Sequence, residues 1–172
     1  LNVNEDKFND KDKKFRCALS WKSANPDTGF SKSIKLVDLL PILSIKDIEF
    51  YNIQYTNEED ELKNFKDQYN IEIKNVKNLD TYNDIYGLLQ FIKTCDFTLS
   101  VSNSNAHLAC SIGCPTYLLL PKEVGKFWYW ENKIEDKNLW YPNVKIFNQI
   151  SANEWKDPIS QIKKELINHY SI

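Results

Sequence analysis

The chain has 172 residues, 42% of them hydrophobic and 13% aromatic, which is enough for one domain with a substantial core. The formal net charge is −2, so we expect no nucleic-acid partner, because such binding normally requires a basic field. No apolar run approaches the roughly 20 residues of a transmembrane helix, and no signal peptide is visible. We therefore expect a cytoplasmic protein without a transmembrane segment.

The titratable residues do not indicate a metal or cofactor. The four cysteines are Cys17, Cys95, Cys110 and Cys114, none forms a CxxC pair, and each lies in or beside an apolar segment. This pattern predicts reduced, buried thiols rather than a zinc site or a disulfide. No acidic group has metal-ligand spacing, and the glycine-rich dinucleotide and P-loop signatures are missing.

The chain begins with a polar, charge-dense stretch, residues 1–14, which we interpret as a linker or a disordered arm. The sequence contains no Met, so Leu1 is not a translation start, and we expect the chain to belong to a longer protein. Residues 15–172 are then predicted to form a single domain.

Strand and helix patterns alternate along this domain. The predicted strands are residues 15–21, 49–55, 71–76, 97–101, 116–120 and 144–147. The predicted helices start at a Ser33 cap, an Asn57 cap, a Thr81–Asp84 capping box, Ala106 and an Asp157–Pro158 pair. Strands separated by helices require crossover connections, so the pattern predicts an α/β protein with a doubly wound, mostly parallel, Rossmann-like sheet.

The most informative stretch runs from Asp96 to Pro121. It consists of an alternating strand, a polar turn (Ser102–Asn105), a short helix from Ala106 to Ile112, and a second apolar strand. In parallel sheets, ligands bind beyond the carboxyl ends of the strands, and the free N–H groups at a helix start favour anions. The turn therefore predicts a phosphate site, although ordinary helix capping would also explain its Asn and Ser residues.

Several other residues are candidates for this site. His107 lies in the first turn of the short helix, where it could donate to a phosphate or serve a purely structural role. Lys32 directly precedes the predicted Ser33 cap, a position that disfavours a cation without an anionic partner. Lys22 and Lys122 each follow a predicted strand. The aromatic run Phe127–Trp130, with Trp140–Tyr141, is either a covering clamp or a base-stacking pocket.

The chain resembles the C-terminal domain of heptosyltransferase-like glycosyltransferases, including those fused to tetratricopeptide repeats. The family signature Ala-His-Leu-Ala, followed by Gly and Pro, is matched by Ala106–Ala109, Gly113 and Pro115. Further similar segments follow in the same order: ALSWKSANP, SKSIKLVDLLPIL, FYNIQY, WYW, LWYPNVKIFNQ and EWKDPISQIKKEL. The sequence departs from the family at Ser102 for Asp, Cys110 for Gly, and Lys32 for Arg.

The resemblance implies one Rossmann-like half of a GT-B fold, which binds a nucleotide-sugar donor without a metal. The donor-binding residues that it implies are Lys32, Gln54, Ser102, Asn103, Ser104, Asn105, His107 and Lys122. It implies no catalytic residue here, because the base and the acceptor site belong to an N-terminal half that we expect to lie outside this chain. Fused tetratricopeptide repeats are a further partner that the resemblance implies.

Two other interpretations are open. A degenerate, non-catalytic transferase domain could act as a scaffold, with residues 127–141 as its contact surface. A flavodoxin- or receiver-like domain is the weakest alternative, because a receiver needs acidic residues where Ser20, Trp21 and Lys22 follow each other.

Overall fold

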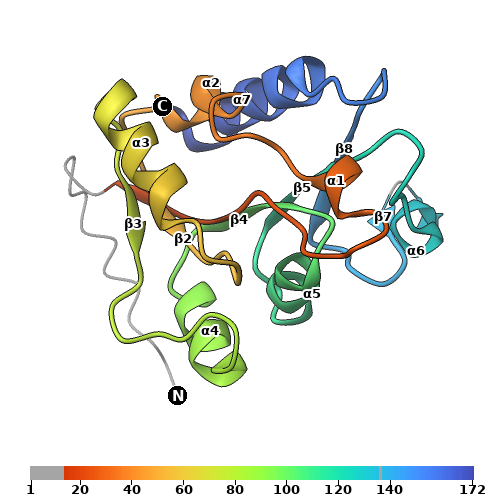
Figure 1. The fold of residues 1–172 in the computed structure, drawn as a ribbon. Coiled ribbons are helices and arrows are strands. Elements are labelled where there is room, and N and C mark those ends of the chain that lie inside the picture. Colours follow the sequence, from red (N-terminus) through yellow and green to blue (C-terminus); the bar gives the residue numbers. More distant parts are fainter. Residues whose placement is uncertain (1–13, 136) are drawn as a thin grey trace.

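The computed structural model describes residues 14–135 and 137–172, so the predicted arm lies outside the described residues except for Lys14. A six-stranded parallel sheet with the order β3-β2-β1-β4-β5-β8 forms the centre of the molecule (Figure 1). Its strands are β1 (Phe15–Ser20), β2 (Ile48–Asn52), β3 (Ile73–Asn75), β4 (Phe97–Val101), β5 (Thr116–Leu120) and β8 (Val144–Asn148). The predicted Rossmann-like α/β fold is confirmed.

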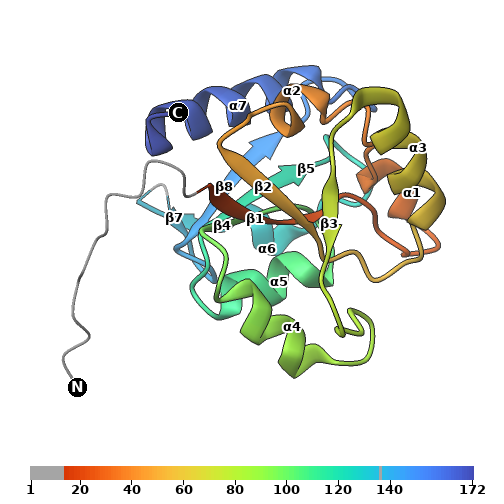
Figure 2. The ribbon, with the colours of Figure 1, turned by 90° about the vertical axis from the view of Figure 1, so that its left-hand side faces the viewer.

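Helices cover both faces of the sheet (Figure 2). On one face lie α2 (Leu40–Leu43), α3 (Glu59–Tyr69) and α7 (Lys156–Tyr170). On the other lie α4 (Ile85–Ile92) and α5 (Ser104–Ser111). Beyond the carboxyl ends of the strands lie α1 (Gly29–Lys32) and α6 (Trp128–Glu131). A small hairpin of β6 (Lys133–Ile134) and β7 (Lys137–Asn138) lies beside the edge strand β8.

The core is divided by the sheet into two layers. In β1, Cys17 and Leu19 pack into the cluster shared with α2, α3 and α7, whereas Ala18 faces the cluster beneath α4 and α5. This follows from the alternation of side chains along a strand. Both faces are buried, which explains why β4 and β5 are buried at every position. Ala18 and Ala109 are small, so α5 lies close to the sheet.

The predicted helix with its cap at Ser33 is wrong. The short helix α1 ends at Lys32, Ser33 has an extended backbone with ψ of 145°, and the next helix is the single turn α2. The Ser33 hydroxyl donates to the Gly29 carbonyl at 2.7 Å and accepts the Ser23 amide at 3.0 Å, so it closes α1 instead of starting a helix. Lys32 therefore lies at a helix end, where its charge suits the dipole.

The other helices begin close to their predicted starts. Asp84, rather than Thr81, caps α4 by accepting the Gly87 amide. The start of α5 is at Ser104, two residues before the prediction, because Asn103 is its N-cap. Within residues 14–135 and 137–172, no helix combines the length and hydrophobicity required to cross a bilayer.

Candidate functional site at the carboxyl edge of the sheet

Two asparagines connect the start of α5 to the ends of β1 and β2. Asn103 accepts the Ala106 amide at 3.3 Å, and its Nδ2 donates to Ser20 Oγ at 2.7 Å and to the Lys22 carbonyl at 2.9 Å. Asn105 donates to Ser20 Oγ at 3.2 Å and to the Ile53 carbonyl at 2.6 Å. Both side chains are buried and point into the protein. They fix the position of the helix start relative to three strands.

Gln54, directly after β2, completes this network. Its Oε1 accepts from Ser20 Oγ at 3.0 Å and from the Trp21 and Lys22 amides at 3.1 Å each. Its Nε2 donates to the Lys22 carbonyl at 3.0 Å and to Thr56 Oγ1 at 3.1 Å. Both polar ends of the amide are thus occupied within the protein, an arrangement that suits positioning of the β1 loop. Direct contact between Gln54 and a donor stays a prediction.

The ring of His107 packs against the aromatic side chains of Tyr129, Trp130 and Tyr141. Its ring stacks on Trp130, with centroids 4.6 Å apart at 24°, and its Nδ1 lies 3.0 Å from the Tyr141 hydroxyl. Burial, together with the positive charge of Lys32, lowers the pKa of His107 below its usual value, which favours the neutral ring. When the Tyr141 hydroxyl donates to Nδ1, the proton resides on Nε2, which becomes a hydrogen-bond donor.

The aromatic segment after β5 has an inner and an outer part. Trp130 is fully buried, and its Nε1 donates to Ser102 Oγ at 3.0 Å, so the covering-clamp interpretation is confirmed for this residue. Trp128 and Trp140 are 64% and 55% exposed, with ring centroids 6.4 Å apart. The hydrogen bond from Trp130 therefore fixes the Ser102 side chain, whereas the indole rings of Trp128 and Trp140 are exposed to solvent.

Lys32 is a buried cation to which the described residues offer no carboxylate partner. Only 3% of its surface is exposed, and its Nζ lies 4.9 Å from the centre of the Phe127 ring. Among the described residues, no carboxylate pairs with it, whereas the ammonium of Lys22 pairs with both Glu58 and Glu61. Burial lowers the pKa of Lys32. An unpaired, buried lysine is costly in free energy, which makes it a candidate for binding an anion.

The loop after β5 covers Lys32. Ser31 donates to the Val124 carbonyl at 2.7 Å, which ties α1 to this loop. Gly125 has a φ of +82°, and a Cβ there would lie 2.8 Å from Lys32 Cγ. A glycine is therefore required both by the backbone and by the lysine stem beneath it.

The remaining predicted residues lie at the surface. Ser104 is exposed at the first position of α5, where the leading N–H groups have no partner within the helix. Lys122 is exposed directly beyond β5. The structure thus places Lys32, Ser104 and His107 at one edge of the sheet, with Gln54, Asn103 and Asn105 as the supporting network beneath. Lys122 belongs to the same edge.

Gln149 was missed by the sequence interpretation. It follows β8 as Gln54 follows β2, and its Oε1 accepts the Lys122 amide at 3.2 Å. It is 5% exposed, and its Nε2 is buried without a partner among the described residues. A glutamine after a predicted strand is the signal that could have identified it. Within the described ranges, no group of three or more His, Cys, Asp or Glu is placed to hold a metal.

The fold is shared with a glycosyltransferase. The crystal structure of the glycosyl transferase family 9 from Veillonella parvula superimposes with a TM-score of 0.53, over 92% of this chain and 38% of that chain. The sequence identity is 8%, so the likeness is one of fold, a Rossmann-like domain of the GT-B type. No family model matches the chain.

The sequence is also similar to that of a bacterial protein. Protein FlbA of Caulobacter vibrioides is 22% identical over 152 residues, which cover 88% of this chain. The match takes in 25% of that protein, so the chain spans about a quarter of this relative's length.

Proposed function

We propose that this chain is the donor-binding domain of a metal-independent glycosyltransferase and binds a nucleoside diphosphate sugar at the amino end of α5. The observation that carries the proposal is Lys32, a buried ammonium without a carboxylate partner among the described residues. It lies in the same aromatic cluster as His107, because Phe127 contacts Lys32 and stacks on Tyr129, which contacts the histidine. A diphosphate at this place supplies the missing negative charge.

In this proposal, the site stabilises the leaving group. When the bond between the anomeric carbon and the diphosphate oxygen breaks, negative charge accumulates on the distal phosphate. Lys32 offsets that charge directly, and neutral His107 and the first amides of α5 donate hydrogen bonds to it. Ser104 adds a hydroxyl donor, and Lys122 approaches from the rim. A pre-positioned set of donors is effective because it requires no reorganisation during the reaction.

The buried amides have a supporting role in the proposal. Gln54, Asn103 and Asn105 hold the ends of β1, β2 and α5 at fixed positions, and Ser102 does the same for the aromatic clamp through Trp130. The Nε2 of Gln149 is buried without a partner among the described residues, so this amide is a further candidate for a donor contact. The base and the acceptor site would come from a further domain of a longer protein, and tetratricopeptide repeats are the additional part that we propose for it.

Titration calorimetry of the 172-residue chain with the diphosphates of uridine, adenosine, guanosine, cytidine and thymidine tests the proposal. We expect one of them to bind, and His107→Ala to weaken it at least tenfold, about 1.4 kcal/mol. His169→Ala, which changes an exposed histidine at the end of α7, serves as the matched control. The melting temperature should stay nearly constant in both variants.

A degenerate scaffold is the second candidate, and the exposed indoles of Trp128 and Trp140 favour it, because such rings are typical of protein contacts. Absence of binding by all five diphosphates would decide for this candidate. A collapse of the melting temperature in His107→Ala, parallel to the loss of binding, would assign the histidine to structure.

A further inference from the structure

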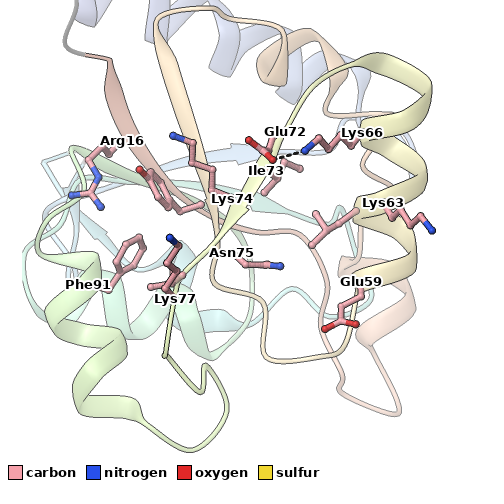
Figure 3. Close-up of a pocket in the computed structure, with 13 residues that line it drawn as sticks. Arg16, Glu59, Lys63, Lys66, Glu72, Ile73, Lys74, Asn75, Lys77 and Phe91 are labelled. Atoms are coloured by element: carbon pink, nitrogen blue, oxygen red, sulfur yellow. Dashed lines mark hydrogen bonds and ion pairs between the residues drawn. The ribbon is translucent and has the colours of Figure 1, made fainter.

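A basic groove follows the outer edge of β3, away from the candidate donor site (Figure 3). Its volume is about 720 Å³, with α3 on one side of the strand and α4 on the other. Five basic side chains line it: Arg16, Lys63, Lys66, Lys74 and Lys77. Only two acidic residues do so. The whole chain has a net charge of −2, so the groove concentrates positive charge on an otherwise slightly acidic protein.

Part of this positive charge is already neutralised. Lys66 pairs with Glu72, drawn as a dashed line in Figure 3, and Lys74 pairs with Glu49 at 2.7 Å. In the part of the chain that the structure describes, Arg16, Lys63 and Lys77 have no ion-pair partner. Of these, Lys77 lies beside β3, whereas the Lys63 side chain points away from the strand and Arg16 lies on β1, two strands further in.

Arg16, the only arginine of the chain, is held in a defined position. Its guanidinium carbon lies 4.8 Å from the Tyr51 ring centre and 5.4 Å from that of Phe91. Its Nη1 donates to the Thr94 carbonyl at 3.2 Å, and its Nε is buried without a partner among the described residues. The aromatic rings fix the guanidinium plane and leave hydrogen-bonding capacity unused.

The strand in the middle of the groove has a free edge. β3 pairs with β2, and the sheet ends there, so the outer backbone groups of β3 have no strand neighbour within the described residues. Lysines on an edge strand discourage pairing with a second, equally basic edge. The same lysines favour a strand that carries carboxylates.

We propose that the edge of β3 binds an extended acidic segment of a partner protein, which adds as a further strand beside β3. Backbone hydrogen bonds to β3 supply the register, and alternate side chains point to the two faces of the added strand. Carboxylates on one face meet Lys66, which points from α3 toward β3, and those on the other meet Lys77 on the α4 side. The inference does not depend on the proposed donor site.

Fluorescence anisotropy with a labelled peptide of about eight residues, the length of an ordinary strand, tests this proposal. The peptide repeats Glu-Glu-Val-Thr, so that Glu lies on both faces of the strand. We expect saturable binding to the 172-residue chain. The double variant Lys66→Glu/Lys77→Glu should weaken this binding at least tenfold. The matched control, Lys156→Glu/Lys164→Glu, reverses two exposed lysines of α7 outside the groove and should change it less than twofold.

Two further probes separate strand addition from simple charge attraction. A peptide of the same sequence with N-methylated backbone amides keeps its charge but cannot pair as a strand, so we expect its binding to be lost. Equal binding of the methylated peptide would overturn strand addition. Tighter binding of a thymidine oligonucleotide of equal charge would identify a general polyanion surface instead. Failure of the acidic peptide to bind the unmodified chain would overturn the proposal as a whole.

Discussion

Lys22 and Lys32 are both lysines in the segment that follows β1, yet the fold gives them opposite surroundings. Lys22 meets two carboxylates of the α3 region, while Lys32 is buried beneath the loop after β5, next to the Phe127 ring. The sequence singles out Lys32 only by its place before the predicted Ser33 cap and by the family resemblance. The difference depends on Gly125 and Phe127, which are nearly a hundred residues further along the chain and close over Lys32 only in the folded protein.

Replacement of Lys32 by Met should separate binding from stability. We expect nucleoside diphosphate affinity to fall at least tenfold, about 1.4 kcal/mol, because the central cation is lost. The free energy of unfolding should stay constant or rise, because an unpaired buried charge is replaced by an apolar side chain of similar shape. Calorimetry and urea unfolding measure the two quantities.

Lys35→Met, at an exposed neighbour, is the control and should alter neither quantity. A marked loss of stability in Lys32→Met would mean that the ammonium has a structural partner.

His107 should make the protein sensitive to acid. Its pKa is lowered in the folded state, so on acidification the unfolded chain binds the proton first. Stability is therefore fully present at neutral pH and declines as the pH falls through and below the unfolded value of about 6.5. His107→Gln removes this contribution.

The comparison is between melting temperatures at pH 7 and pH 5. Between pH 7 and pH 5, the melting temperature of the unmodified chain should fall further than that of His107→Gln. Equal losses in the two proteins would assign the acid sensitivity to other groups.

The start of α5 is the element on which the candidate site is built. Its sequence signals are local: an alternating strand, then Asn and Ser, then a short helix with a glycine stop. This is why the stretch from Asp96 to Pro121 could be predicted. The inward orientation of Asn103 and Asn105 could not, because their partners, Ser20 and Ile53, belong to other strands.

The same reasoning explains the failure at Ser33, whose hydroxyl suits a helix cap by type. In the fold, this hydroxyl donates to the Gly29 carbonyl and accepts from the Ser23 amide, so it cannot cap a following helix. The missed Gln149 is a further case, because its importance becomes visible only through the Lys122 amide that it binds.

Asn103→Ala should destabilise the protein by roughly 2 kcal/mol in urea unfolding. The helix loses its cap, which alone is worth about 1 kcal/mol, and the Lys22 carbonyl and Ser20 hydroxyl lose a buried donor. Ser104→Ala, at the exposed next position, is the matched control and should stay within about 0.5 kcal/mol of the unmodified chain. Similar effects of the two substitutions would contradict the inward network.

At the scale of the whole molecule, the four thiols lie in or next to the packed interior. Cys17, Cys110 and Cys114 are buried and Cys95 is half-buried, and all four are free. Burial raises the pKa of Cys95 to about 12 and that of Cys110 to about 11. The prediction of buried thiols is confirmed for Cys17, Cys110 and Cys114.

We expect the folded chain to react only slowly with Ellman's reagent at pH 8, because the thiolate is the reactive form and burial suppresses it. In denaturing urea, all four thiols should react within the mixing time of a manual experiment. A thiol that reacts equally fast in both conditions would show that one of these cysteines is accessible in the folded protein.

The pairing of β1 with β4 has a consequence for the order in which the protein folds. It joins residues about 80 positions apart, as in the bond from the Arg16 amide to Asp96, whereas β1–β2 and β4–β5 close shorter loops. Closing the longest loop carries the greatest entropy loss, so the two halves of the sheet can each form before they join. The Ser20–Asn103 contact belongs to this last step. Refolding kinetics should therefore show the candidate site appearing together with the slowest phase, so that recovery of ligand binding marks the completion of the sheet.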